Sequence, residues 1–413
     1  MRVLVVGSGG REHALCLALT RDPAVEAIVC APGNAGTDQV AENRPLDVAD
    51  PLAVAELAAE VRADLTIVGP EVPLVAGAVD ELTRRGLAAF GPSAAAARLE
   101  GSKAFAKEVM VAAGVPTARA RDHANPTTAL ADLDEFGPPY VIKYDGLAAG
   151  KGVTVTSDRE AAVEAVRSCL QGPDDRLVLE EYLDGPEVSL FVVVPPDGEP
   201  VPLVPAQDAK RVGDGDTGPN TGGMGAYTPL PWAPDGLVDQ VLDQVVRPTV
   251  AEMARRGTPY TGLLYVGLAL TANGPRVVEF NCRFGDPETQ AVLARLDSPL
   301  TELLAGGIPR WRDEAAVTVV LAAENYPGTP VTGGTVSGLD AAAAVPGVSV
   351  LHAGTRREGD DVVASGGRVL AVTALGTDLA HARESAYDAL GRIGLPGAHF
   401  RTDIARAAAE RPQ

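Results

Sequence analysis

Four short apolar segments within the first hundred residues constrain the fold of this chain more than any other feature. Residues 3–6, 27–30, 65–68 and 88–90 have the composition of buried strands, and helical patterns separate them. Strands that alternate with helices form a parallel sheet, because a parallel pair needs a long crossover connection. The sequence therefore predicts a Rossmann-like N-terminal α/β domain, with ligands at the carboxyl ends of its strands.

The glycine-rich turn after the first strand, residues 7–13 (GSGGREH), is predicted to hold a phosphate. Glycines that open a helix leave backbone N–H groups free for an anion. The turn lacks the third glycine of the dinucleotide fingerprint and no acid follows the second strand, which argues against a nicotinamide cofactor. Glu71, after another strand, would either reach the same crevice or simply serve as an acid favourable at a helix N-terminus. The candidate residues in the turn are Gly9, Gly10, Arg11 and Glu12.

A second polar segment, residues 276–290 (RVVEFNCRFGDPETQ), is predicted to be a strand followed by a turn. Alternation along the strand places Glu279, Asn281 and Arg283 on one face. The opposite, core-facing side would then hold Val278, Phe280 and Cys282. A carboxylate and an amide oxygen beside a guanidinium suit Mg²⁺ next to a phosphate, because Mg²⁺ takes only one or two oxygens from protein. The alternative is that these three side chains form the solvent-exposed polar face of an edge strand and bind no ligand.

Composition limits the class of protein. At 413 residues the chain is long enough for two to four domains, and 46% hydrophobic with 22% charged residues is typical of soluble globular proteins. The net charge of −20 argues against nucleic acid and anionic membranes as partners. No apolar run reaches the roughly 18 residues of a membrane span, and no signal peptide precedes the first strand, so a cytoplasmic protein is expected. Four scattered cysteines indicate neither a disulfide framework nor a zinc site.

Lysine is scarce and unevenly placed. Of 35 basic residues only five are lysines, all in one quarter of the chain: Lys103, Lys107, Lys143, Lys151 and Lys210. A compact ammonium on a flexible stem is a reason to keep lysine where arginine dominates, although chance and biased codon usage would give the same pattern. Ser102 is predicted to cap a helix at 103–113, where an anion would offset the lysine in its first turn.

Residues 140–155 read as a strand, a glycine-rich loop and a second strand. The loop is not a Walker A motif, which would continue into a helix. It is predicted either to close as a flap over a triphosphate or to be a plain hairpin with exposed lysines. A strand at 177–183 leads into a linker suited to adenine edges. The run 207–227 has too little apolar content for a core and is predicted to be a functional loop.

The second half of the chain ends in a small α+β unit. An amphipathic helix at 237–254 and a strand at 262–270 precede the 276–290 segment. The final piece is expected to contain strands at 317–322 and 367–374 and a helix at 378–393.

Together these segments resemble the ATP-grasp superfamily and, within it, the phosphoribosylamine–glycine ligase family, over nearly the whole chain. The resemblance rests on GSGGREHAL at 7–15, EGSKAFAK at 100–107, DGLAAGKGV at 145–153, GDGDTGPNTGGMGAY at 213–227, EFNCRFGDPETQ at 279–290 and, more weakly, HFRTDIA at 399–405. It implies an α/β and α+β multidomain fold: a preATP-grasp domain at 1–101, an ATP-grasp domain at 102–314 with a flap at about 120–188, and a C-terminal cap at 315–413.

The resemblance also implies roles for individual residues. The phosphates of ATP would lie near Lys103, Lys143, Lys151, Gly146 and Gly150. Its adenine would lie near Glu180, Tyr182 and Leu183, and its ribose near Glu187. Mg²⁺ or Mn²⁺ would bind Glu279 and Asn281. The reacting groups would be served by Arg283, Lys210, Asp208 and Asp214. The sugar phosphate and glycine would contact Gly9, Gly10, Arg11, Glu12, Glu71, Asp216, Asn220, Gly223 and Gly225.

The implied reaction is ATP-dependent joining of glycine to 5-phosphoribosylamine by a monomer, with no nucleic-acid or membrane partner. Two positions depart from the family pattern: Ala209 stands where a histidine is usual, and Tyr144 where an alanine is usual. Loss of that imidazole puts an acid–base or positioning role there in doubt. The alternatives are a different ATP-grasp carboxylate–amine ligase and a catalytically silent ATP-binding sensor.

Overall fold

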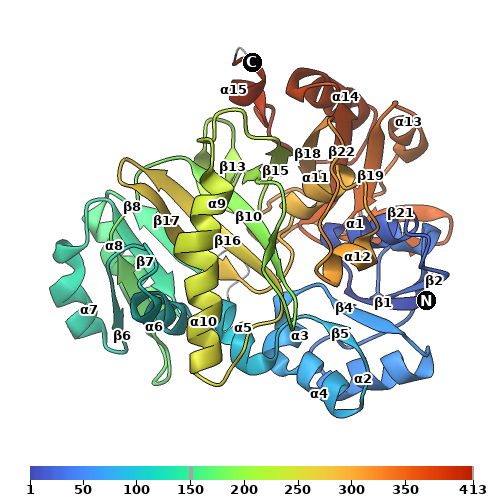
Figure 1. Cartoon of the computed structure of the whole chain (residues 1–413). Helices are drawn as coiled ribbons and strands as arrows, with labels where there is room; N and C mark the ends of the chain where they lie inside the picture. The colour runs from blue at the N-terminus through green and yellow to red at the C-terminus, as the bar shows by residue number, and fades with distance from the viewer. Residues whose placement is uncertain (148–151, 412–413) are drawn as a thin grey trace.

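The computed structural model describes residues 1–147 and 152–411. In Figure 1 the N-terminal sheet lies at the lower right, the flap at the left, and the C-terminal segment at the upper right. A long helical rod formed by residues 237–255 crosses the front. None of the helices in the described part of the chain combines the length and apolar character that a membrane crossing needs.

The N-terminal sheet is parallel, as predicted, with strand order β3-β2-β1-β4-β5. Its strands are β1 (Arg2–Gly7), β2 (Ala27–Pro32), β3 (Glu42–Asn43), β4 (Leu65–Val68) and β5 (Ala89–Phe90). Its helices are α1 (Gly10–Leu19), α2 (Pro51–Glu60), α3 (Glu71–Ala76), α4 (Ala78–Arg84) and α5 (Ala94–Gly101), with a 3-10 turn at Thr37–Gln39. Val3 and Val5 pack with Leu15 of α1, whereas Leu4 on the other face packs with Val54 of α2. Burial on both faces explains the continuous apolar strands.

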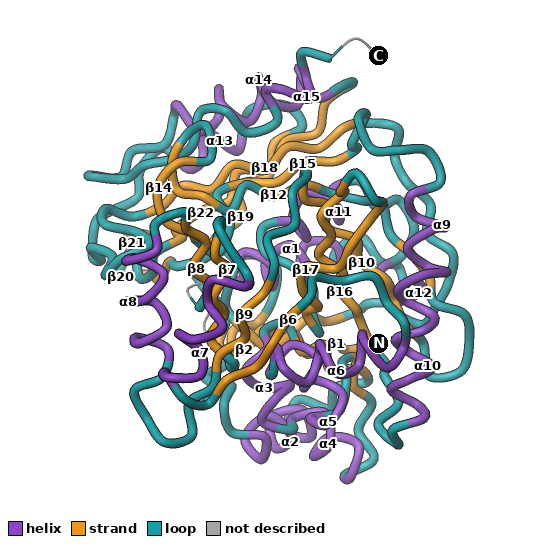
Figure 2. The backbone as a smooth tube through the Cα atoms, turned by 90° about the vertical axis from the view of Figure 1, so that its left-hand side faces the viewer, coloured by secondary structure: helices purple, strands orange, loops and turns teal. Residues whose placement is uncertain are grey.

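The flap is an antiparallel sheet with order β6-β9-β7-β8. It contains β6 (Ala120–His123), β7 (Tyr140–Tyr144), β8 (Val153–Thr156) and β9 (Leu177–Glu180), with α7 (Pro126–Asp132), α8 (Arg159–Cys169) and a 3-10 turn at Leu133–Glu135. Figure 2 shows α7 and α8 on the outer side of these strands. The two predicted strands are confirmed, because β7 pairs with β8. Gly150 and Lys151 lie outside the described residues.

A central antiparallel sheet, β11-β10-β16-β17, carries the predicted metal strand. Its strands are β10 (Glu187–Val194), β11 (Val201–Pro202), β16 (Gly262–Thr271) and β17 (Gly274–Asn281). The surrounding helices are α6 (Lys103–Ala113), α9 (Leu237–Val241), α10 (Arg247–Arg255), α11 (Glu288–Ala294) and α12 (Leu300–Leu304). The predicted helix at 237–254 is interrupted by a π-helical turn at Leu242–Val246, just before Pro248, which has no N–H to donate.

One prediction about β17 is wrong. Gly267 pairs with Glu279 but Leu268 pairs with Val277, so Val278 is an extra residue in a β-bulge. The bulge shifts the alternation: Val278 is only half-buried, and Val277 takes its place in the core. Phe280 and Cys282 are buried as predicted, at 2% and 1% exposed.

The C-terminal sheet has order β12-β15-β18-β22-β19. Its strands are β12 (Gln207–Asp208), β15 (Gly225–Thr228), β18 (Ala315–Ala322), β19 (Val348–His352) and β22 (Arg368–Gly376). Two hairpins, β13 (Arg211–Gly213) with β14 (Thr217–Asn220) and β20 (Thr355–Glu358) with β21 (Asp361–Ala364), and helices α13 (Leu339–Ala343), α14 (Leu379–Gly391) and α15 (Arg406–Ala409) complete this part.

The prediction of a loop throughout 207–227 is therefore wrong, because four strands, β12, β13, β14 and β15, lie in this run. All residues of β15 are buried, and β15 pairs with β18. Gly225 makes this pairing possible, because a Cβ there would lie 2.7 Å from the carbonyl oxygen of Thr318. Strands from both sides of position 315 thus share one sheet.

Candidate active site

The site is built around a buried carboxylate held by two lysines. Lys143 of β7 places its Nζ 2.9 Å from Glu180 Oε2 and donates to the carbonyl of Val278 at 3.0 Å. Lys107 of α6 lies 3.3 Å from Glu180 Oε1 and donates to Thr117 Oγ1 at 2.8 Å. The three charged side chains are each at most 10% exposed. These contacts join the flap, α6 and the central sheet. Sequence reasoning did not assign Lys107 to the site, although the scarcity of lysine had singled it out.

Glu279 lies within a group of positive charges. Burial opposes its ionisation, yet the charges of its neighbours hold the pKa of Glu279 below its ordinary value. Those neighbours are Lys210, Lys143, Lys103 and Arg283. The cations come from four separate segments of the chain, so the fold gathers them around one carboxylate. Asn281, two residues further along β17, is half-buried.

The start of α6 is tied to the flap. Ser102 caps the helix as predicted, since its Oγ accepts from the N–H of Phe105 at 3.1 Å. Asp145 accepts from the N–H of Ala104 at 3.2 Å and from Ser102 Oγ at 3.1 Å. Lys103 donates from Nζ to the carbonyl of Gly146 at 3.0 Å. The anion expected at this helix start is therefore supplied, in this structure, by a side chain of the flap.

Lys210 belongs to a second acidic group. Its Nζ lies 2.7 and 2.9 Å from the two carboxylate oxygens of Asp208 and 3.3 Å from Glu187 Oε2. Burial opposes the charge on Lys210, but these acids raise its pKa well above the ordinary value. Ala209 between them is held by its backbone, which donates to the carbonyl of Gly225 at 2.9 Å.

The adenine-side candidates do not share one environment. Tyr182 is exposed and Leu183 is half-buried, whereas Glu180 is buried against the lysines. The Glu180 carboxylate therefore faces cations in this structure.

Arg283 is engaged by two acids of the N-terminal region. Its Nη2 lies 3.0 Å from Glu100 Oε1 and its Nε lies 3.3 Å from Glu71 Oε2. Glu71 is also the first residue of α3, so both alternatives proposed for it fit its position. Glu100 was not predicted; it accepts from the N–H of Cys282 at 2.6 Å, and burial raises its pKa. These contacts join the N-terminal sheet to the end of β17.

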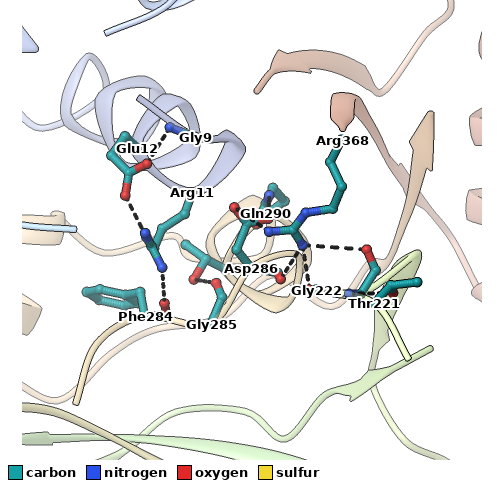
Figure 3. A network of polar contacts seen from close by, with 12 residues as sticks. Gly9, Arg11, Glu12, Thr221, Gly222, Phe284, Gly285, Asp286, Gln290 and Arg368 are labelled. Carbon is teal, nitrogen blue, oxygen red and sulfur yellow. Dashed lines mark hydrogen bonds and ion pairs between the residues drawn. The ribbon is translucent and has the colours of Figure 1, made fainter. Parts of the chain in front are cut away.

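The glycine turn is closed by its own glutamate. Glu12 is fully buried, and its carboxylate accepts from the N–H of Gly9 at 2.5 Å and from Arg11 Nε at 2.6 Å (Figure 3). Arg11 also donates to the carbonyl of Phe284 at 3.1 Å. A Cβ at Gly69 would lie 2.0 Å from Glu12 Oε1, so that carboxylate fills the crevice between two strand ends. Phosphate binding by this turn, Gly10 included, stays a prediction.

Arg368 of β22 connects three parts of the chain (Figure 3). Its Nη1 donates to the carbonyls of Gly222 and Asp286 at 2.6 Å each, and its Nη2 lies 3.4 Å from Asp286 Oδ2. Gln290 of α11 donates to Asp286 Oδ1 at 2.8 Å. Gly223 has a φ of +108°, and a Cβ there would lie 2.4 Å from Pro287 Cδ. Only glycine fits this approach between the two loops.

The β13–β14 hairpin places the predicted residues Asp214 and Asp216 against the C-terminal segment and Asn220 against the flap. Asp214 accepts from the backbone N–H of Thr402 at 2.8 Å and from its hydroxyl. Asp216 Oδ1 lies 2.6 Å from Arg401 Nη1. Asn220 donates to the carbonyl of Val153 in β8 at 3.4 Å. In residues 1–147 and 152–411, no hydrogen bond or ion pair joins Asp214 or Asp216 to the lysine group. The hairpin instead spans the C-terminal segment and the flap.

The donor set around β17 suits a cation that keeps few protein ligands. Among the described residues, no three His, Cys, Asp or Glu side chains gather as a metal-binding group. Glu279 and Asn281 offer one carboxylate and one amide oxygen on β17. An ionised carboxylate surrounded by cations fits a site that Mg²⁺ shares with phosphate groups.

Comparisons with known proteins agree with this architecture. Family models described as the N domain, the ATP-grasp (A) domain and the C domain of phosphoribosylglycinamide synthetase match residues 1–100, 101–289 and 316–407. The phosphoribosylamine–glycine ligases of Streptomyces coelicolor and Mycobacterium leprae are 60% and 57% identical, each over 99% of this chain and 100% and 99% of their own lengths.

Solved structures give the same result. The crystal structure of the Thermotoga maritima phosphoribosylamine–glycine ligase matches with a TM-score of 0.82 and 32% identity, covering 98% of this chain and 100% of the other. The biotin carboxylase of Campylobacter jejuni shares the fold, with a TM-score of 0.74 at 15% identity over 100% of this chain and 95% of its own.

The fold and the lysine-lined site between its sheets define an ATP-grasp enzyme. Within that class, the chain belongs to the phosphoribosylamine–glycine ligase family.

Proposed function

We propose that this chain joins glycine to 5-phosphoribosylamine, converting ATP to ADP and phosphate and releasing glycinamide ribonucleotide, a step of purine biosynthesis. The observation that carries the proposal is the position of Glu279 among Lys103, Lys143, Lys210 and Arg283. A polyanion such as a triphosphate needs this density of positive charge, because phosphoryl transfer depends mainly on positioning and charge neutralisation.

The chemistry requires no nucleophilic side chain. The carboxylate of glycine attacks the γ-phosphorus of ATP, ADP leaves, and glycyl phosphate forms. The amine of the sugar then attacks the glycyl carbonyl carbon, and phosphate leaves as the amine gives up a proton. Lys103 and Lys143 are assigned to the ATP phosphates, and Arg283 to the transferred group once it exchanges its acidic partners for phosphate oxygens. When bound on Glu279 and Asn281, Mg²⁺ or Mn²⁺ would neutralise and orient phosphate oxygens.

The binding site for the acceptor substrate, 5-phosphoribosylamine, is assigned to the loops held by Arg368 and to the glycine turn closed by Glu12. Gly9 before α1 and Gly223 in the loop before β15 lie close to Asp286, since a Cβ on either would come within 3.4 Å of it; Gly10 lies beside Gln290. Figure 3 shows Gly9 and Arg11 on the same side of the site as Asp286. Glycyl phosphate hydrolyses readily in water, so the flap must exclude solvent while it exists. The contact from Asn220 to Val153 joins the acceptor-side hairpin to the flap and supports such a closed arrangement.

The proposal extends to the organisation of the protein. The domains are assigned to residues 1–101, 102–314 and 315–413, with the flap at about 120–188. The substrates are small molecules, and the protein is proposed to act as a cytoplasmic monomer.

The test is ADP release with ATP and Mg²⁺, using phosphoribosylamine generated in situ, with and without glycine. Turnover that needs both glycine and the amino sugar is expected. Glycine-independent ADP release, or turnover with a different amine, would instead indicate another ligase. ATP binding without turnover would indicate a sensor. Glu302→Gln, an exposed change on α12, serves as the control for variants of the site.

A further inference from the structure

Two adjoining cavities lie next to the candidate site. They are formed where the N-terminal helix α1, the region of α11 and the C-terminal strands meet. The smaller cavity, called the inner cavity here, has a volume of about 80 Å³ and is lined by residues of α1, α11 and the C-terminal strands β19 and β22; it is open to solvent at the exposed Arg21. The outer one, of about 350 Å³, is bounded by the end of α1 and the segment that follows α11. Arg21 and Arg312 line both. In Figure 1 these elements come together at the right of the molecule.

The inner cavity is positively charged. Its wall contains Arg21 and Arg312 and no acidic side chain. Within the described residues, neither guanidinium has a carboxylate oxygen within the 4.0 Å of an ion pair. Among the described residues, the one acceptor for the Arg21 guanidinium is the carbonyl of Leu293, at 3.2 Å. In a protein with a net charge of −20, two unpaired guanidinium groups facing one cavity form a site for an anion.

A buried polar atom in the same wall also has no partner. Gln290 is 2% exposed, and its Oε1 accepts no hydrogen bond from the described residues. Arg312 Nε, likewise buried, donates none. Buried polar groups are almost always paired, so an unpaired acceptor and an unpaired donor on two residues that line the same cavity indicate a molecule that completes both. Such a ligand needs anionic oxygens for the guanidinium groups and a donor, such as a hydroxyl, for Gln290.

The combined size of the cavities indicates how large that molecule is. Small-molecule sites are usually clefts of about 300–1,000 Å³, and the outer cavity reaches this range. We propose that this junction binds a hydroxyl-bearing phosphate monoester, a sugar phosphate or a nucleoside monophosphate. Its phosphate lies between Arg21 and Arg312, and a hydroxyl donates to Gln290 Oε1. A phosphate monoester carries close to two negative charges at neutral pH and so matches two guanidinium groups.

The position of Gln290 connects this junction to the candidate active site. Gln290 lines the inner cavity, and its Nε2 donates to Asp286 Oδ1. Asp286 in turn is held by Arg368, which also holds the carbonyl of Gly222. A ligand that binds Oε1 orients the amide group and with it Asp286. Binding at the junction is therefore expected to change the Michaelis constant for the acceptor rather than to supply a reacting group.

The experiment is calorimetric titration of ribose 5-phosphate and, separately, adenosine monophosphate, with ADP and Mg²⁺ saturating the nucleotide site. The wild-type protein is expected to show a binding event at the junction. The Arg21→Gln and Arg312→Gln variants should lower its affinity about tenfold to a hundredfold, as for loss of a charged hydrogen bond. Arg167→Gln, on the exposed face of α8, should retain it. The ester that shows this binding event identifies the ligand as a sugar phosphate or a nucleotide.

Two results would overturn the proposal. Isotherms that are the same for both arginine variants and the wild type would show that the junction binds neither ester. Inorganic phosphate binding as tightly as the esters would show that no organic part is recognised. Arg21 is exposed, so its replacement keeps the test valid if the Arg312 variant folds poorly. Because the titration needs no turnover, its failure is distinct from failure of the proposed ligase activity.

Discussion

Lys143 and Glu180 form a buried ion pair between adjacent strands of the flap, with Nζ 2.9 Å from Oε2. Burial opposes the charge on Lys143, yet Glu180 and Glu279 raise its pKa above the ordinary value. Lys107 reaches the other oxygen of Glu180 from α6, outside the flap. Glu180 therefore links the flap to α6, the helix that begins at Lys103. It also keeps the Lys143 ammonium charged beside β17, the strand predicted to bind the metal.

Removing the shared carboxylate should be costly. Glu180→Ala leaves two buried ammonium groups without their acid, and breaking a buried pair from one side typically costs about 3–5 kcal/mol. Urea unfolding at neutral pH measures the loss. Glu199→Ala, which removes an exposed partner of Arg247 at 3.1 Å, should cost about 1 kcal/mol or less. Equal losses for the two variants would mean that the Glu180 pair does not stabilise the fold.

Glu279→Gln tests the metal strand. The change keeps the shape of the side chain but removes the negative charge among Lys103, Lys143, Lys210 and Arg283. Loss of a ligand that organises phosphate charge should lower kcat at least about a hundredfold, comparable to the loss of one strong electrostatic contact in a transition state. Steady-state ADP release gives kcat, and near-ultraviolet circular dichroism checks the fold. Activity close to that of Glu302→Gln would refute the assignment of Glu279.

Arg368→Met should weaken the acceptor side. The variant leaves the half-buried carbonyls of Gly222 and Asp286 without their donor, at a cost of at most about 1–3 kcal/mol each, the range for fully buried groups. The loops on both sides of Asp286 should loosen, which raises the Michaelis constant for phosphoribosylamine more than that for ATP. Arg356→Met, on the exposed β20–β21 hairpin, is the matched control. Equal changes in both constants would argue against a specific role on the acceptor side.

A buried histidine pair should make the fold sensitive to acid. Burial, followed by the charge of His352, lowers the pKa of His13 to about 3 from an ordinary 6.5, and burial lowers that of His352 to about 4. Above pH 6.5 both histidines are neutral in the folded and in the unfolded chain, so they do not make the free energy of unfolding depend on pH. Below it the unfolded chain takes up protons that the folded chain refuses, so stability should fall by up to about 2 kcal/mol per histidine between pH 6.5 and 5.

Unfolding by urea at several pH values measures this slope. His13→Asn keeps an acceptor for the N–H of His352, which donates to His13 Nδ1 at 2.8 Å, and removes one titrating group. The profile of this variant should be flatter. The exposed His381→Asn should follow the wild type, and a wild-type slope in His13→Asn would exclude His13 as the cause.

Local elements could be predicted because local interactions specify them. The helix at 103–113 begins after a capping serine and ends at Gly114, and the structure has the same bounds. The bulge at Val278 could not be predicted, because it exists only in the pairing of β17 with β16. Strand β15 was missed for the same reason: glycine-rich residues lack apolar periodicity, and their burial comes from β18.

The candidate site divides in the same way. The chemistry was readable from residue types: the scarce lysines, the polar strand with Glu279 and Asn281, and the motifs that identify the family. The contact partners of these residues could not be predicted from the sequence. Glu100 and Glu71 hold Arg283, and Thr402 holds Asp214 across 188 residues of sequence. Nothing in the local pattern around Asp214 indicates that it faces the C-terminal segment.

The sequence by itself determined the family, the parallel N-terminal sheet and the residue types of the site, since motifs and strand or helix periods act within short stretches of chain. Only the tertiary structure decided which charges meet. It set Lys107 and Lys143 on the two oxygens of Glu180, and it placed Arg21 and Arg312 together in the wall of the inner cavity, where neither forms an ion pair with a described residue. Electrostatic energy depends on distance and burial in space, and neither is encoded by separation along the chain.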